Sequence, residues 1–413
     1  MINVENIYRA KIRLKDIVTA TPLTYNHNLS EKYQCTILLK REDLQVVRSY
    51  KIRGAYNKMA QLDPVQLKNG ITCASAGNHA QGVAFACNQM KVHGHIFMPA
   101  VTPQQKISKV RSFGKSYVEV ILHGDTFDDA YHQATLFTEK EGKTFIHPFN
   151  DEKIIEGQGT VGLEILEDCN KTIDYVFAGV GGGGLISGLG SCFRQISPNT
   201  KIIGVEPEGA PAMFEALKAG KVVALDTIDS FVDGAAVKKV GDITFAIAQE
   251  VVDDMLLVKE GKVCSTILQL YNEEGIVVEP AGALTIGALD QYRDQIKGKT
   301  VVCVVSGSNN DITRTEEIKE RSLLYEGLKH YFIIKFPQRP GALKEFLNHV
   351  LGPHDDITHF EYTKKHNREL GPAVIGILLQ DPADYPQLVA RMQQHNMHFQ
   401  TINDQELLFG LLI

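Results

Sequence analysis

Four consecutive glycines, residues 181–184, are the clearest chemical signal in this 413-residue sequence. They separate an apolar run, DYVFAGV, from a helix-like segment that begins near Leu185. Glycine loses more backbone entropy on folding than other residues, so such a run needs a reason. Without Cβ atoms the amides approach an anion closely, and a helix N-terminus adds its dipole. The pattern predicts a phosphate site, with a tight turn as the alternative. No Lys-Ser or Lys-Thr follows, which argues against a P-loop.

A second turn of small and polar residues lies in ITCASAGNHAQGVA. Ser75, Ala76, Gly77 and Asn78 end a strand-like run and precede a helix-like one. Free amides at such a turn suit a carboxylate, and the amide of Asn78 can hydrogen-bond a ring hydroxyl. A helix cap is the other role open to Asn78. His79, in the first helical turn, is interpreted as a structural histidine.

Two further residues carry little information by themselves. Ser306 follows the very apolar run TVVCVV, where it reads as an ordinary turn residue. Lys51 stands in RSYKIRGA, and nothing nearby distinguishes it from an exposed surface lysine.

The segments that position these residues alternate between strand-like and helix-like patterns up to about residue 310. This alternation predicts an α/β fold with a largely parallel sheet, in which ligands bind at the carboxyl ends of the strands. After about residue 325 a compact β-α-β-β-α-β pattern predicts a separate domain. The expected strands are KNGITCASA, HGHIFMPA, SYVEVILHG, DYVFAGV, TKIIGVEP and KTVVCVVSG, followed in the last domain by HYFIIKFP, DDITHFEYTK, PAVIGILLQ and HFQTIND.

The composition is 44% hydrophobic and 22% charged, with a net charge of −6, as in soluble globular proteins. The absence of a long basic run argues against a nucleic-acid or anionic-membrane surface. No apolar run of about 18 residues suggests a membrane span, so a cytoplasmic protein is expected. Seven cysteines without a CxxC pair argue against a disulfide framework or a zinc site.

Five motifs occur in the order found in a known family: RSYKIRGA, SAGNHAQGVA, GGGGLISG, EPAGA and VVSGSN. Together they resemble the threonine/serine dehydratase branch of the fold-type II pyridoxal-phosphate enzymes, over essentially the whole chain. The resemblance implies pyridoxal 5′-phosphate (PLP) as the cofactor, joined to Lys51 as a Schiff base. It also implies a phosphate site at Gly181, Gly182, Gly183, Gly184 and the Leu185 amide, contacts from Asn78 to the 3′-hydroxyl and from Ser306 to the pyridine nitrogen, and a substrate carboxylate at Ser75, Ala76, Gly77, Asn78 and His79.

The implied reaction is β-elimination of water from L-threonine, with L-serine as a second substrate. Lys51, once displaced from the cofactor, would remove the Cα proton, and the products would be 2-oxobutanoate and ammonia. A neutral hydroxyl from Ser306 at the ring nitrogen favours prompt elimination over transamination.

The resemblance also implies the architecture of tryptophan synthase β-like enzymes. A catalytic domain would occupy residues 1–320, with a smaller subdomain of about 46–149 inserted in the larger one. A linker of residues 321–328 would lead to a ferredoxin-like, ACT-like domain in residues 329–413, whose FPQRPGALKEF resembles biosynthetic threonine dehydratases. This implies the first step of isoleucine synthesis, feedback by isoleucine, relief by valine, and a homotetramer. A dimerisation domain without a ligand is the alternative.

Other functions are less compatible with particular residues. Serine racemases carry a second serine where this chain has Ala76, and an acid where it has Ala212 after Glu206 and Pro207. Racemisation therefore lacks an acid–base group, and no metal site is expected. A catabolic serine/threonine dehydratase remains an alternative. So does an amino-acid sensor without chemistry, which would be colourless.

Overall fold

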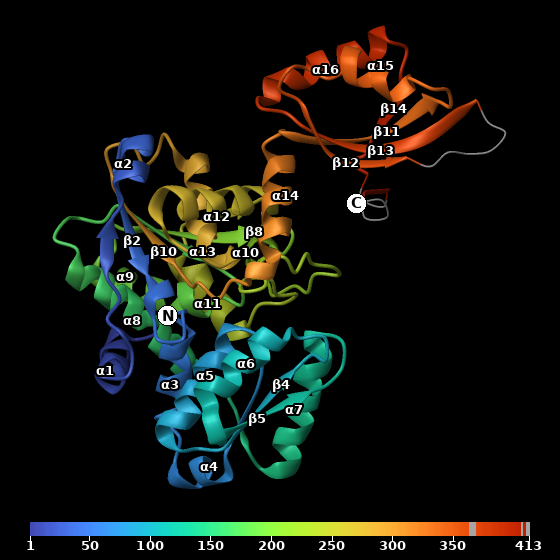
Figure 1. Cartoon of the computed structure of the whole chain (residues 1–413). Coiled ribbons are helices and arrows are strands. Elements are labelled where there is room, and N and C mark those ends of the chain that lie inside the picture. Colours follow the sequence, from blue (N-terminus) through green and yellow to red (C-terminus); the bar gives the residue numbers. More distant parts are fainter. Residues whose placement is uncertain (363–368, 406–407, 410–413) are drawn as a thin grey trace. The chain divides into compact units, whose positions relative to one another are not determined.

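The structure, a computed structural model, describes residues 1–362, 369–405 and 408–409. The chain divides into two compact units, Met1–Ile312 and Thr313–Ile413 (Figure 1). Among the helices of these residues, none has the length and apolarity that crossing a bilayer would require.

The larger sheet of the first unit has six strands in the order β1-β2-β10-β7-β8-β9. Every neighbouring pair is parallel except β1 with β2. The expected strands at β7, β8 and β10 are confirmed, and β10 is buried along its whole length. The bounds are β1 Leu23–Tyr25, β2 Thr36–Arg41, β7 Tyr175–Gly179, β8 Lys201–Pro207, β9 Asp254–Val258 and β10 Thr300–Val305.

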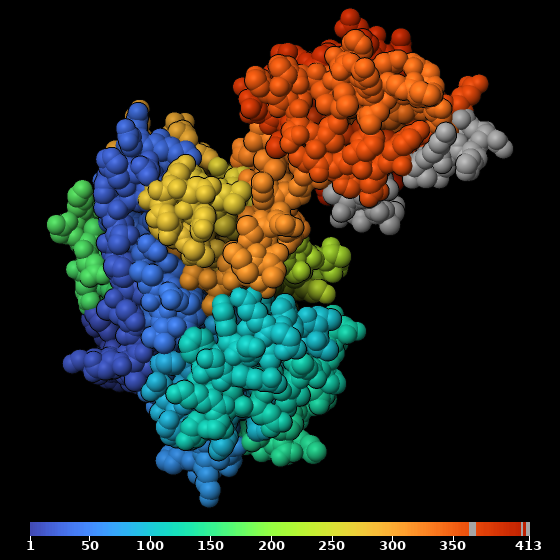
Figure 2. All heavy atoms as spheres, viewed as in Figure 1, coloured from blue at the N-terminus to red at the C-terminus, as the bar shows by residue number. Residues whose placement is uncertain are grey.

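A smaller sheet, entirely parallel, has the order β5-β4-β3-β6. In the chain its strands fall between β2 and β7. Its helices α5, α6 and α7 pack against the strands, and the residues coloured light blue to teal in Figure 2 form this lobe. The bounds are β3 Ile71–Ala74, β4 Gly94–Met98, β5 Val118–Leu122, β6 Thr144–Phe145, α5 Asn78–Met90, α6 Gln104–Gly114 and α7 Phe127–Glu141.

Three helices of the first unit, α3 (Lys51–Met59), α8 (Glu152–Asp168) and α9 (Gly184–Ile196), pack in succession. Glycines bring their backbones together: a Cβ added at Gly157 would lie 2.5 Å from the carbonyl oxygen of Arg53. This close approach fixes the position of α3, which begins at Lys51. The other helices are α1 Val4–Leu14, α2 His27–Tyr33, α4 Pro64–Asn69, α10 Ala212–Ala219, α11 Asp242–Val251, α12 Glu260–Glu274 and α13 Pro280–Gly287.

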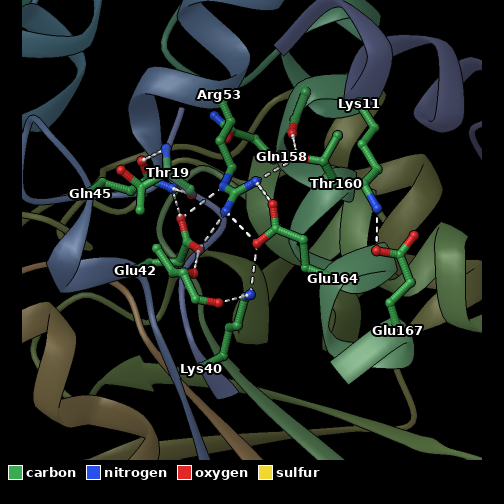
Figure 3. A network of polar contacts seen from close by, with 12 residues as sticks. Lys11, Thr19, Lys40, Glu42, Gln45, Arg53, Gln158, Thr160, Glu164 and Glu167 are labelled. Atoms are coloured by element: carbon green, nitrogen blue, oxygen red, sulfur yellow. Dashed lines mark hydrogen bonds and ion pairs between the residues drawn. The ribbon is translucent and has the colours of Figure 1, made fainter. Parts of the chain in front are cut away.

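A buried network of charged side chains also holds α3 in place (Figure 3). Arg53 is fully buried and pairs with Glu42 at 2.8 Å and with Glu164 at 2.6 Å. Lys40 lies 2.7 Å from the second carboxylate oxygen of Glu164. Two cations thus face two buried carboxylates, with the half-exposed Asp168 3.8 Å from Lys40, as a buried charge cluster requires. The network ties the first turn of α3 to the end of β2 and to α8.

The second unit begins with α14 (Thr315–Tyr325), which includes residues 321–325 of the expected linker. The expected β-α-β-β-α-β order is confirmed, in an antiparallel sheet with the order β12-β13-β11-β14. Residues 363–364, expected to end a strand, lie outside the described residues. The bounds are β11 Lys329–Pro337, α15 Ala342–His349, β12 Asp356–Tyr362, β13 Leu370–Leu378, α16 Tyr385–Gln394 and β14 His398–Thr401.

Candidate active site

Lys51 is the first residue of α3 and lies beside the turn that follows β10. Its Nζ donates a hydrogen bond to the carbonyl oxygen of Pro148, at 3.0 Å. The amide of Tyr50 donates to the carbonyl oxygen of Ser306, at 3.2 Å. The structure therefore brings Lys51 and Ser306 together from positions far apart in the sequence.

The surroundings of Lys51 favour its neutral amine. Burial lowers its pKa to about 8, and the negative charge of Glu279 only partly opposes this. Burial, with the charge of Lys51, lowers the pKa of His79 to about 3 and that of His147 to about 4. Both imidazoles are therefore neutral at neutral pH, and Lys51 can lose its proton at a pH far nearer 7 than an exposed lysine can.

The glycine run after β7 has the properties of an anion cradle. Gly183 has a φ of 91°, in the left-handed region that favours glycine. A Cβ added at Gly182 would lie 2.2 Å from the ring of Phe149. Among the described residues, none accepts a hydrogen bond from the amides of residues 181–185. Five unpaired donors at the start of α9 suit a phosphate.

In the turn between β3 and α5, some backbone amides are hydrogen-bonded within the protein and others are not. The amide of Ser75 donates to Phe97 O at 3.1 Å, and that of Gly77 to Ser75 Oγ at 3.2 Å. The amides of Ala76 and Asn78 have no acceptor within the described part of the chain. A Cβ added at Gly77 would meet nothing within 4 Å, so the turn borders open space. Two amides are thus available for a carboxylate.

His79 is buried in the first turn of α5. Its Nε2 donates to the carbonyl oxygen of Ile146, at 2.8 Å. Its Nδ1 has no hydrogen-bond partner within the described ranges. This position is that of a structural histidine that holds α5 against the segment after β6.

Ser306 stands at the carboxyl end of β10, next to β7 in the sheet. The residue is buried, with 5% of its surface exposed. Its Oγ has no partner in the described chain, so a hydroxyl group is left for a ligand atom.

Glu279, which was not among the expected site residues, joins the Asn78 turn to the segment after Ser306. Glu279 accepts from Asn78 Nδ2 at 2.6 Å and from the amide of Asn309 at 3.1 Å. Burial, followed by the charge of Asp233, raises its pKa to about 7. The signal in the sequence was the EPAGA motif, where a single acid stands in an apolar stretch.

Residues 147–150 also belong to the site, although the sequence patterns did not identify them. His147 Nδ1 accepts from the amides of Phe149, at 3.2 Å, and Asn150, at 2.8 Å. This bend places Pro148 O at Lys51 and the Phe149 ring against the glycine run. The sequence HPFN has no pattern that would have revealed this position.

Glu206, in β8, binds the start of helix α10. Its carboxylate accepts from the amides of Met213 and Phe214, both at 2.8 Å, at the start of α10. Burial raises its pKa to about 8. Its oxygens therefore bind backbone donors of the helix that begins at Ala212.

A partly buried amine at the start of α3, a row of free amides after β7 and an unpaired hydroxyl at the end of the neighbouring β10 fit a cofactor with an aldehyde, a phosphate and a ring nitrogen. Residues 14–307 match the family described as pyridoxal-phosphate dependent enzyme. Residues 320–412 match the C-terminal regulatory domain of threonine dehydratase. The class is thus that of the PLP-dependent enzymes, with the tryptophan synthase β-like α/β fold.

The similar proteins define the family more narrowly. The biosynthetic L-threonine dehydratase IlvA of Bacillus subtilis (strain 168) is 60% identical, over 100% of this chain and 98% of that protein. The IlvA of Staphylococcus aureus (strain COL) is 55% identical over 100% and 99%. A processed threonine deaminase isoform from Solanum lycopersicum is 41% identical, with a TM-score of 0.73, over 78% of this chain and 94% of that one. The chain belongs to the biosynthetic threonine dehydratase family.

Proposed function

We propose that the chain is a PLP-dependent ammonia-lyase that converts L-threonine to 2-oxobutanoate and ammonia, the first step of isoleucine biosynthesis. The observation that carries the proposal is the partly buried Lys51, with its lowered pKa, whose amine donates to Pro148 O. The next residue, Phe149, packs against the row of unpaired amides. The full-length similarity to biosynthetic threonine dehydratases supports the substrate. Bound PLP supplies an electron-withdrawing ring that makes the substrate Cα–H bond acidic.

The protein's own groups divide the work of binding and proton transfer. Lys51 Nζ is the group that would hold the cofactor at its aldehyde carbon, and as a free amine it would accept the proton from the substrate Cα. The amides of Gly181, Gly182, Gly183, Gly184 and Leu185 hold the phosphate. Those of Ala76 and Asn78, in the Ser75–His79 turn, hold the substrate carboxylate. The side chain of Asn78 contacts the 3′-oxygen.

Ser306 sets the protonation of the ring nitrogen. A carboxylate beside this nitrogen would raise the pKa of the nitrogen and keep the ring positively charged. The negative charge on the substrate Cα would then persist longer, and transamination would compete with elimination. We expect Ser306→Asp to retain PLP but to lower kcat for 2-oxobutanoate formation at least about tenfold, which is ~1.4 kcal/mol in the barrier. Ser306→Thr, which keeps a hydroxyl, is the matched control. Equal turnover in the Asp variant and the wild type would refute this role.

The C-terminal unit is proposed to regulate the reaction. We assign catalysis to residues 1–320, the connection to 321–328, and an ACT-like effector domain to 329–413. The similarity of residues 320–412 to a regulatory domain supports this assignment. Isoleucine is the proposed inhibitor, and valine is proposed to relieve the inhibition. The protein is proposed to be a cytoplasmic homotetramer that also accepts L-serine as a slower substrate.

One assay tests substrate and regulation together. The rates of 2-oxobutanoate formation from L-threonine and of pyruvate formation from L-serine are measured side by side, with and without isoleucine. We expect threonine to be preferred and isoleucine to reduce the rate, with valine restoring it. A preference for serine would favour the catabolic alternative, and an unchanged rate with isoleucine would favour a purely structural C-terminal domain.

A further inference from the structure

Glu279 holds both the Asn78 turn and the Ser306 turn. Its Oε1 accepts from Asn78 Nδ2 at 2.6 Å, and its Oε2 accepts from the backbone amide of Asn309 at 3.1 Å. A Cβ added at Gly307 would lie 2.4 Å from Oε1, so backbone crowds the carboxylate on that side. With 4% of its surface exposed, Glu279 has little room to move.

The same contacts determine which way the Asn78 amide faces. Asn309 Nδ2 donates to Asn78 Oδ1 at 2.7 Å, while Asn78 Nδ2 donates to Glu279. Rotating the Asn78 amide by half a turn would place its oxygen against the carboxylate and its nitrogen against the Asn309 amide nitrogen. Both contacts would become repulsive, so the observed orientation is strongly preferred.

An amide nitrogen carries two hydrogens, and Glu279 takes one of them. The second remains for a ligand atom, which must be an acceptor. We propose that Glu279 is a positioning residue that fixes Asn78 as an N–H donor toward the 3′-oxygen of the cofactor. This inference rests on the proposed function, because it needs PLP to bind beside Asn78.

Glu279→Gln tests the proposal with little change of shape. A glutamine has one acceptor oxygen, so its NH₂ group must face either Asn78 Nδ2 or the Asn309 amide, both of them donors. Apoprotein is titrated with PLP, and the dissociation constant and the visible absorption band are recorded. We expect about tenfold weaker PLP binding and a shifted band. Glu156→Gln, at a buried glutamate of α8, is the control and should leave both unchanged.

A double-variant cycle separates positioning from a general loss of structure. If Glu279 acts through Asn78, Glu279→Gln should add no further band shift to Asn78→Ala. Asn309→Ala, which removes the second restraint on the Asn78 amide and retains Glu279, should shift the band in the same direction. This second variant keeps the test decisive if Glu279→Gln does not fold.

The possible failures are distinguishable. A wild-type protein that never acquires the visible band would overturn the proposed function and this inference with it. A coloured wild type whose Glu279→Gln and Asn309→Ala variants bind PLP with the same affinity and the same band would overturn the inference alone. Additive band shifts in the double variant would assign Glu279 a separate effect and would also overturn it.

Discussion

Replacing Lys51 with alanine is expected to abolish 2-oxobutanoate formation from L-threonine and to remove the yellow colour of the protein. The side chain supplies both the covalent attachment and the base, so its loss should cost at least about 10³-fold in kcat. No other described lysine donates a hydrogen bond to Pro148 O. A neighbouring amine is therefore not available to replace it.

The matched control is Lys58→Ala, on the same helix. Lys58 pairs with Asp151 at 2.7 Å and is partly exposed, so this change should leave colour and turnover close to those of the wild type. Absorbance spectra before and after borohydride, together with the rate assay, make the comparison. A colourless wild type would favour the amino-acid sensor, and an active Lys51→Ala variant would exclude the proposed chemistry.

Replacing Arg53 with methionine is expected to have the largest effect on stability. Methionine leaves Glu42 and Glu164 in a fully enclosed network that retains only the positive charge of Lys40. Removing one partner of a buried charge cluster typically costs about 3–5 kcal/mol. Because Arg53 is two residues after Lys51 on α3, we also expect weaker PLP binding.

Urea unfolding followed by the visible absorbance of the bound cofactor measures this effect on the unit Met1–Ile312. Arg9→Met is the control, since Arg9 pairs with Glu5 on an exposed helix surface and should change the free energy of unfolding by less than about 1 kcal/mol. Arg53→Lys should lie between the two, because an ammonium group cannot bind both carboxylates in the bidentate manner of a guanidinium. A free energy of unfolding within about 1 kcal/mol of the wild type in Arg53→Met would contradict the importance of the network.

Local sequence patterns predicted the parts of the fold that depend on local physics. Continuous apolar runs located β7, β8 and β10, and the last domain showed its strand and helix order directly. The short β1 and the half-polar β2, which ends in Lys40 and Arg41, gave too weak a signal. The turns after β3 and β7 were predicted to bind ligands because glycine and small polar residues follow each strand, whereas the turn after β10 was assigned a role only through the family resemblance.

The rest of the site depends on contacts between distant residues. Asn78 and Glu279 are 201 positions apart, and no local pattern links them. The burial of Arg53 was equally hidden, since its two carboxylate partners come from different elements. Lys51 itself was singled out only because its motif resembles a known family. Contacts between residues far apart in the sequence determine where these side chains lie, and local residue patterns do not reveal such contacts.

The bend at residues 147–150 has a consequence for how the two ends of the site respond to a disturbance. Pro148 O takes the hydrogen bond of Lys51, while Phe149 forms the wall of the glycine cradle. One short stretch of backbone thus contacts both the amine of Lys51 and the glycine run. We therefore expect a displacement of this stretch to change the affinity of the proposed phosphate site and the pKa of Lys51 together.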